Sequence, residues 1–130
     1  MDREIKVRAW DKNNQEMAKI ISIELKPDQT YQMLTVQYSD GEVISEYLDS
    51  FELLWCTGLT DKKGTEIYEG DVVEDDYIAI SEDRSQVYFQ NGAFWVNYGG
   101  AVKLLADRDM RHIKVIGNKF EDPELLNDNE

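Results

Sequence analysis

The sequence predicts a mostly β protein built from short antiparallel strands. Three observations predict this fold class: apolar and polar residues alternate in short runs, turn-forming dipeptides separate the runs, and apolar residues with helical spacing are scarce. The 130 residues suit one domain or two small subdomains. Three Trp, seven Tyr and four Phe can supply a core without a metal or a disulfide.

Alternation defines the strands expected in the first half of the chain. Residues 5–9, 21–25 and 34–38 each alternate apolar with polar side chains, as half-buried strands do. Asp40-Gly41 then precedes the apolar pair Val43-Ile44. Asp-Gly favours a two-residue type I′ hairpin, because both central residues of that turn need a positive φ.

Helical spacing occurs in one short stretch, between residues 47 and 55. Leu48, Phe51, Leu54 and Trp55 recur at the intervals of one helix face. We therefore expect a short helix or a 3₁₀ turn in this stretch.

The second half returns to strands and turns. Asn91-Gly92 is a second hairpin signal, and Gly99-Gly100 precedes another apolar run. Further strands are expected at residues 87–89, 94–96, 101–105 and 113–116, and a short turn at residues 123–126.

Composition indicates an acidic protein of the cytoplasm. The formal net charge is −13, with 27 acidic and 14 basic residues. The single cysteine, Cys56, allows no intramolecular disulfide, which fits a reducing compartment. Neither a signal-peptide pattern nor an apolar run of membrane-spanning length is present, so we expect no membrane contact.

The same charge balance disfavours nucleic acid, which attracts Lys and Arg through its phosphates. Two alternatives stay open. Lys6, Arg8, Lys12 and Lys19 make the N-terminal quarter the most basic part, so a nucleic-acid-binding module could use this strand. Conversely, the acidic surface could imitate DNA and occupy a basic protein of the host, because opposite charges steer association.

Residues for catalysis, metal or cofactor binding are sparse. His112 and Cys56 are the chain's only His and Cys, too few for a zinc site, and we expect His112 on a solvated strand edge. Gly58 and Gly64 lack the spacing of a phosphate loop. Oxygen ligands for Mg²⁺ or Ca²⁺ are plentiful but show no EF-hand spacing: Glu69, Asp71, Glu74, Asp75, Asp76, Glu82 and Asp83. We therefore expect no enzyme, no metal site and no cofactor.

Three segments carry a family resemblance. They are residues 5–11, residues 56–73, and residues 115–118 followed by 121–126. In type and order they resemble the YopX family of phage and prophage proteins, except that Cys56 stands where the family usually has Tyr. The resemblance implies an all-β architecture with an SH3-like barrel in the second half, a phage genome context and self-association. It implies no activity, because the family is functionally uncharacterised.

The central segment also has a direct structural interpretation. Asp61 to Gly64 forms a turn in which Gly64 can take a positive φ. Gly70, just before Val72-Val73, suggests a bulge or a bend at a barrel corner. The family-motif positions are therefore interpreted as structural: Trp10, Thr57, Gly58, Leu59, Asp61, Gly64, Ile67, Tyr68, Gly70, Asp71, Gly117 and Asn118.

The resulting prediction is one YopX-like domain over residues 1–130. It would contain two small barrel-like subdomains, at residues 1–60 and 61–126, and a frayed tail at residues 127–130. The expected function is a non-enzymatic phage accessory protein that forms homo-oligomers and engages a protein partner, with a basic host or phage protein as one candidate.

Overall fold

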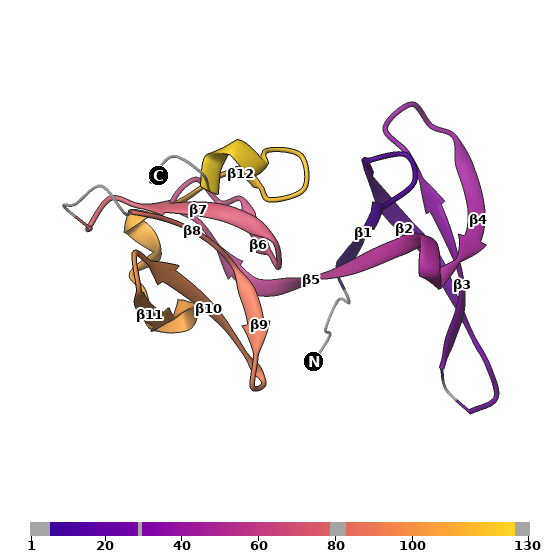
Figure 1. The fold of residues 1–130 in the computed structure, drawn as a ribbon, viewed down its shortest axis with the longest axis horizontal. Helices are drawn as coiled ribbons and strands as arrows, with labels where there is room; N and C mark the ends of the chain where they lie inside the picture. The colour runs from indigo at the N-terminus through magenta and orange to yellow at the C-terminus, as the bar shows by residue number, and fades with distance from the viewer. Residues whose placement is uncertain (1–5, 29, 79–82, 127–130) are drawn as a thin grey trace. The chain divides into compact units, whose positions relative to one another are not determined.

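The computed structural model describes residues 6–28, 30–78 and 83–126 (Figure 1). The mostly β prediction is confirmed, with 57% of the described residues in strands. The chain divides into two compact units, Met1–Trp55 (unit 1) and Cys56–Glu130 (unit 2). Strand β5 crosses from one unit to the other, whereas the sequence suggested a division after residue 60. Residue 5 of the strand expected at 5–9 lies outside the described residues, and so does the whole tail expected at 127–130.

Unit 1 is an antiparallel sheet. Its elements are β1 (Val7–Asp11), β2 (Glu16–Leu25), β3 (Tyr31–Gln37), β4 (Val43–Tyr47), the 3₁₀ helix η1 (Leu48–Ser50) and the first part of β5 (Phe51–Thr60). The pairing order is β4-β3-β2-β1-β5, and β6 follows on the other side of β5. Every pair is antiparallel.

The core of unit 1 lies on one face of this sheet. Ala9, Ala18, Leu34, Val36 and Phe51 are buried together there, as period-two alternation requires. A register shift between Ile20 and Ser22 in β2 marks a bulge, and Ile21 within it is 51% exposed. The bulge explains why an apolar residue of the predicted alternation faces solvent.

The two predicted hairpins have different turns. Asn91 and Gly92 both have a positive φ and join Gln90 directly to Ala93, which confirms the two-residue hairpin. Gly41 has a φ of 92°, but Asp40 is not among the described residues with a positive φ. Tyr38 N donates to Glu42 O, so the loop is longer and the type I′ expectation is wrong there.

The helical spacing between residues 47 and 55 produces only the three-residue 3₁₀ helix η1. Strand β5 begins at Phe51, because residues 51–55 pair with β1. Sheet pairing therefore overrides a helical pattern too short to form a stable helix.

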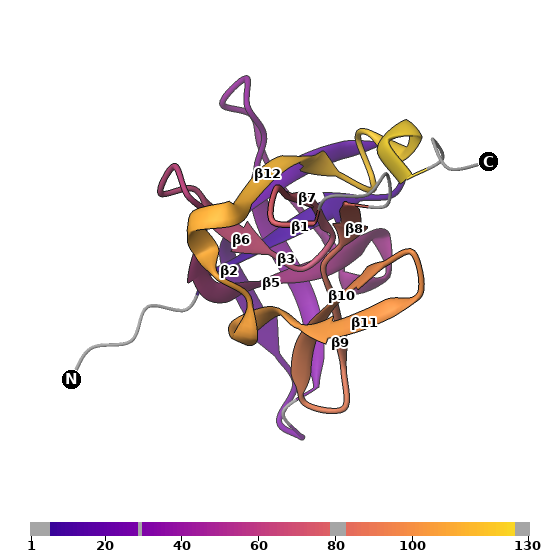
Figure 2. The same ribbon diagram turned by 90° about the vertical axis from the view of Figure 1, so that its left-hand side faces the viewer.

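Unit 2 has shorter strands and more turns. Its elements are the rest of β5, β6 (Glu66–Tyr68), β7 (Asp71–Asp75), β8 (Arg84–Gln86), β9 (Tyr88–Gln90), β10 (Ala93–Tyr98), β11 (Ala101–Leu104), η2 (Leu105–Asp107), η3 (Met110–His112), β12 (Ile113–Asn118) and η4 (Pro123–Leu126). The strand orders are β11-β10-β9 and β12-β7-β8, and Figure 2 shows the first of these groups side by side.

The core of unit 2 draws on most of its elements. The buried side chains are Ile67, Val73, Val87, Val96, Tyr98, Leu105 and Ile113. Strand pairing within the described residues closes no barrel, so the SH3-like arrangement stays a prediction. No helix in the described ranges has the length and apolar character needed to cross a bilayer.

Candidate functional site

Asp61, in the predicted motif, accepts three backbone hydrogen bonds. Its side chain is 6% exposed. Oδ1 accepts from the backbone N–H groups of Lys63 and Thr65, at 2.9 and 2.8 Å, and Oδ2 accepts from Val115 N at 2.9 Å. Burial pushes the pKa of this carboxyl up, but the three N–H bonds outweigh burial and hold the pKa below its usual value. The carboxylate therefore closes the turn that contains Gly64 and ties it to β12.

Asp71 organises the next turn in the same way. Its Oδ2 accepts from Tyr68 N at 2.8 Å, so it closes the turn at Gly70 between β6 and β7. The Gly70 carbonyl accepts from Lys119 N, and Gly70 N donates to Val87 O. Gly70 has a φ of 89°, and it lies in a turn between strands. The expected bend is thus present at Gly70, without a strand bulge.

The bulge of this region lies at Gly58, in β5. The register between β5 and β6 shifts between Cys56 and Thr60, and Gly58 has a φ of 84°. Thr57 Oγ1 donates to Ile67 O at 2.8 Å and accepts from Leu59 N at 3.1 Å. A hydroxyl at the bulge thus supplies partners that the ladder leaves unmet.

The last motif positions, Gly117 and Asn118, close the end of β12. Asn118 Oδ1 accepts from Phe120 N and Glu121 N. A Cβ at Gly117 would lie 2.6 Å from Asp122 Oδ2, so a side chain there would displace its neighbours.

The structure thus brings eleven of the twelve predicted positions together in unit 2, while Trp10 lies buried in β1 of unit 1. In unit 2 the polar members of this set serve backbone hydrogen bonds, which supports their interpretation as structural.

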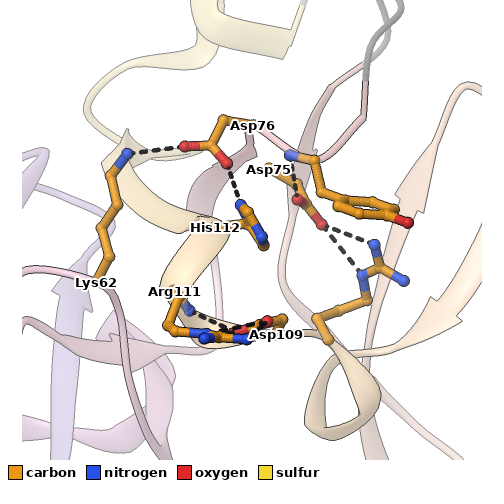
Figure 3. A network of polar contacts seen from close by, with 8 residues as sticks. Lys62, Asp75, Asp76, Asp109, Arg111 and His112 are labelled. Carbon is orange, nitrogen blue, oxygen red and sulfur yellow. Dashed lines mark hydrogen bonds and ion pairs between the residues drawn. The ribbon is translucent and has the colours of Figure 1, made fainter.

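A second polar group surrounds Asp75, at the end of β7 (Figure 3). Asp75 is 1% exposed. Its Oδ1 accepts from Tyr77 N at 3.0 Å, and its Oδ2 accepts from Arg108 Nε and Nη2, both at 3.1 Å. The nearby Tyr98 is buried, and burial together with the negative charge of Asp75 raises the pKa of its hydroxyl. The buried charge of Asp75 is therefore paired and hydrogen-bonded, as burial requires.

Asp76 bridges Lys62 and His112 beside this pair. It accepts from Lys62 Nζ at 3.0 Å and contacts His112 Nδ1 at 2.6 Å. The hydrogen bonds from Lys62 and His112 lower the pKa of Asp76. The ring of Tyr77 lies 5.4 Å from that of His112. His112 belongs to the 3₁₀ helix η3, so its expected place on a strand edge is wrong.

A cavity of about 270 Å³ lies beside these side chains, and we call it the polar pocket. Its lining is Asp75, Tyr77, Asp107, Arg108, Asp109 and His112. Arg111 Nε donates to Asp109 Oδ1 and Arg111 Nη2 donates to Asp109 Oδ2, and this pairing lowers the pKa of Asp109. Of the described residues, no set of three His, Cys, Asp or Glu side chains is arranged to hold a metal ion. Three carboxylates in or beside this polar pocket are thus each paired with a Lys or Arg side chain: Asp75, Asp76 and Asp109.

A different kind of surface occurs at β4, the last strand in the order of its sheet (Figure 1). Tyr38 N donates to Glu42 O, which makes residues 38 and 42 a hydrogen-bonded pair. Such pairs alternate along an antiparallel ladder. By this alternation Val36–Ile44 and Leu34–Glu46 are hydrogen-bonded pairs as well. The N–H and C=O groups of the residues between them therefore point away from β3: Val43, Ser45 and Tyr47.

The side chains of β4 leave this edge unprotected. Val43 and Tyr47 are 50% and 63% exposed and lie on the same face. The strand contains no Lys and no Pro, and its pairing with β3 has no register shift. In natural sheets, Lys, Pro or a bulge in an edge strand often prevents pairing with another chain. We call the outward groups of Val43, Ser45 and Tyr47 the β4 edge; among the described residues, no strand pairs with it.

Neither the polar pocket nor the β4 edge was predicted as a site from the sequence. Asp76 and His112 are 36 residues apart, and no motif joins them. The run 43–47 is recognisable as a strand, but its edge position depends on the order of the whole sheet.

Comparison with known proteins identifies the family. No curated protein matches the chain. Among solved structures, the chain resembles the crystal structure of protein EF1440 from Enterococcus faecalis, with a TM-score of 0.68 and 25% sequence identity. That similarity covers 96% of this chain and 99% of the other. The model of the YopX protein family matches residues 6–127, and the chain therefore belongs to the YopX family.

Proposed function

We propose that this protein is a non-enzymatic phage or prophage accessory protein that self-associates and acts as a protein-interaction module. The observation that carries the proposal is the β4 edge. It combines outward backbone groups at Val43, Ser45 and Tyr47 with two exposed apolar side chains. An edge strand with outward backbone groups and exposed apolar side chains is a template for pairing with another chain.

The state of the polar groups supports the non-enzymatic part of the proposal. In the polar pocket, Asp75 is engaged by Arg108, and Asp76 by Lys62 and His112. A catalytic group needs a free lone pair or proton directed at a substrate. Side chains that neutralise one another in this way are typical of structural ion-pair networks.

The charge of the chain bears on its partners. Two copies with a net charge of −13 repel each other at long range, so self-association must rely on short-range contacts. Added salt screens the repulsion and should tighten the assembly. The same charge would steer a basic host or phage protein toward the surface.

Light scattering after size-exclusion chromatography tests the proposal, over a concentration series reaching the millimolar range. A single strand pair buries little surface, so weak association is expected. The wild type should shift from monomer to oligomer as concentration rises. Ser45→Pro removes one outward N–H without breaking the ladder to β3, because Pro is tolerated at sheet edges. This variant should stay monomeric, while Ser45→Ala should associate like the wild type.

Circular dichroism should show that both variants keep the wild-type fold. A wild type that remains monomeric throughout the series would contradict the proposal. Equal association of the proline and alanine variants would exclude the β4 edge as the contact.

A further inference from the structure

We infer that two copies of this chain pair through β4, antiparallel and about a two-fold axis that passes beside Ser45. This inference rests on the proposed self-association and specifies its partner and register. In this register Val43 faces Tyr47 of the second copy, and Ser45 faces Ser45 of the second copy.

Backbone hydrogen bonding favours this register. The outward residues of β4 are Val43, Ser45 and Tyr47. With the axis at Ser45, each of them lies opposite another outward residue, so all their N–H and C=O groups can pair. An axis one residue earlier places Tyr47 opposite Gly41, which belongs to the turn before β4. An axis one residue later places Val43 opposite Asp49, which belongs to η1.

The acidic side chains near β4 favour the same register. With the axis at Ser45, Glu46 lies opposite Ile44 and Glu42 lies opposite Leu48. With the axis at Ile44, Glu42 lies opposite Glu46 of the second copy. With the axis at Glu46, the two copies of that residue face each other. Like charges directly opposite are destabilising in a sheet, so only the register at Ser45 is free of this penalty among the three.

The exposed side chains are self-complementary in this register. Val43 and Tyr47 lie on one face of the strand, 50% and 63% exposed. The two-fold axis brings each Val43 beside Tyr47 of the other copy, which creates two aromatic–β-branched pairs. Such cross-strand pairs are among the stabilising ones. A second copy of this chain therefore fits the edge better than a generic extended peptide, because each copy places its Val43 beside Tyr47 of the other.

Charge pairs at these positions test the register. Val43→Lys alone and Tyr47→Glu alone should each weaken association by about tenfold, because each removes both apolar pairs of the dimer. The double variant Val43→Lys/Tyr47→Glu places each introduced lysine opposite an introduced glutamate of the other copy. It should associate about tenfold more tightly than either single variant. Sedimentation equilibrium at low salt measures all four proteins.

A matched double variant, Val43→Lys/Ser45→Glu, serves as the control. In the inferred register its glutamates face each other, so it should remain monomeric. In the register centred on Ile44 its lysines and glutamates would pair, so it would associate instead.

The outcomes separate the register from the proposed function. Recovery in the first double variant without recovery in the second supports the inference. Recovery in the second, or in neither while the wild type still associates, overturns the register and leaves self-association standing. A monomeric wild type overturns the proposed function and the inference with it. Circular dichroism confirms that each variant is folded, and all three sites are exposed.

Discussion

Units 1 and 2 use their polar and apolar groups in opposite ways. In unit 2, buried carboxylates such as Asp61 and Asp75 accept hydrogen bonds from backbone N–H groups and from the half-buried Arg108. In unit 1, the strand β4 presents apolar side chains and outward backbone groups to solvent. Nearly all of the family-motif positions lie in unit 2, and none lies in β4. In this chain the polar motif residues mainly bond the backbone, whereas a surface suited to partners can lie outside the motif.

The largest expected effect comes from breaking the buried pair of unit 2. Asp75→Ala leaves Arg108 without its carboxylate partner, and the side chain of Arg108 is only 17% exposed. Removing one partner of a buried ion pair costs about 3–5 kcal/mol. The midpoint of urea unfolding should therefore fall sharply. Arg111→Ala, which removes the exposed pair with Asp109 but keeps the Asp109 cap of η3, is the control and should leave the midpoint nearly unchanged. Equal effects of the two changes would show that burial does not decide the strength of these pairs.

The next effect concerns the motif itself. Asp61→Ala leaves the N–H groups of Lys63, Thr65 and Val115 without their acceptor. Each unmet buried group costs about 1–3 kcal/mol, but the turn can relax toward water, so we expect a total loss of about 3 kcal/mol. Urea unfolding at neutral pH measures this loss. A loss below about 1 kcal/mol would mean that the motif carboxylate does not hold unit 2 together.

The carboxylate of Asp61 also makes the free energy of unfolding depend on pH in acid. The pKa of Asp61 is lower in the folded protein than its ordinary value of 3.8. Its contribution to the free energy of unfolding is therefore complete above that value and is lost as pH falls through the folded pKa. Asp61→Asn should make stability fall less steeply with acid over this range. Circular dichroism during urea unfolding, repeated down to about pH 3, compares the two slopes.

Local features of both units were predictable from the sequence, and long-range ones were not. The turns at Gly64 and Asn91-Gly92 follow from residues that accept a positive φ. The same rule failed at Asp40-Gly41, where the Tyr38 carbonyl accepts from Gly41 N and the loop lengthens. The ion pair of Asp76 with His112 joins distant segments, so no local pattern could indicate it. The open side of β4 is likewise a property of the strand order.

The smallest expected effect on stability comes from the β4 edge of unit 1. Tyr47 is 63% exposed, and exposed positions usually change stability by less than about 0.5 kcal/mol. Tyr47→Ser should therefore leave the unfolding midpoint of the monomer almost unchanged while it weakens self-association. Leu34→Ala, at a fully buried position of the neighbouring strand, should by contrast cost about 2–5 kcal/mol.

Salt then separates the two properties of unit 1. Added salt screens the repulsion between two copies of charge −13, so association of the wild type should tighten as salt rises. Tyr47→Ser should remain weaker than the wild type at every salt concentration, because it has lost short-range contacts and not charge. If Tyr47→Ser destabilised the monomer as much as Leu34→Ala does, the side chain would belong to the core of unit 1. The contrast between a motif that holds the fold and an edge that is free for partners would then fail.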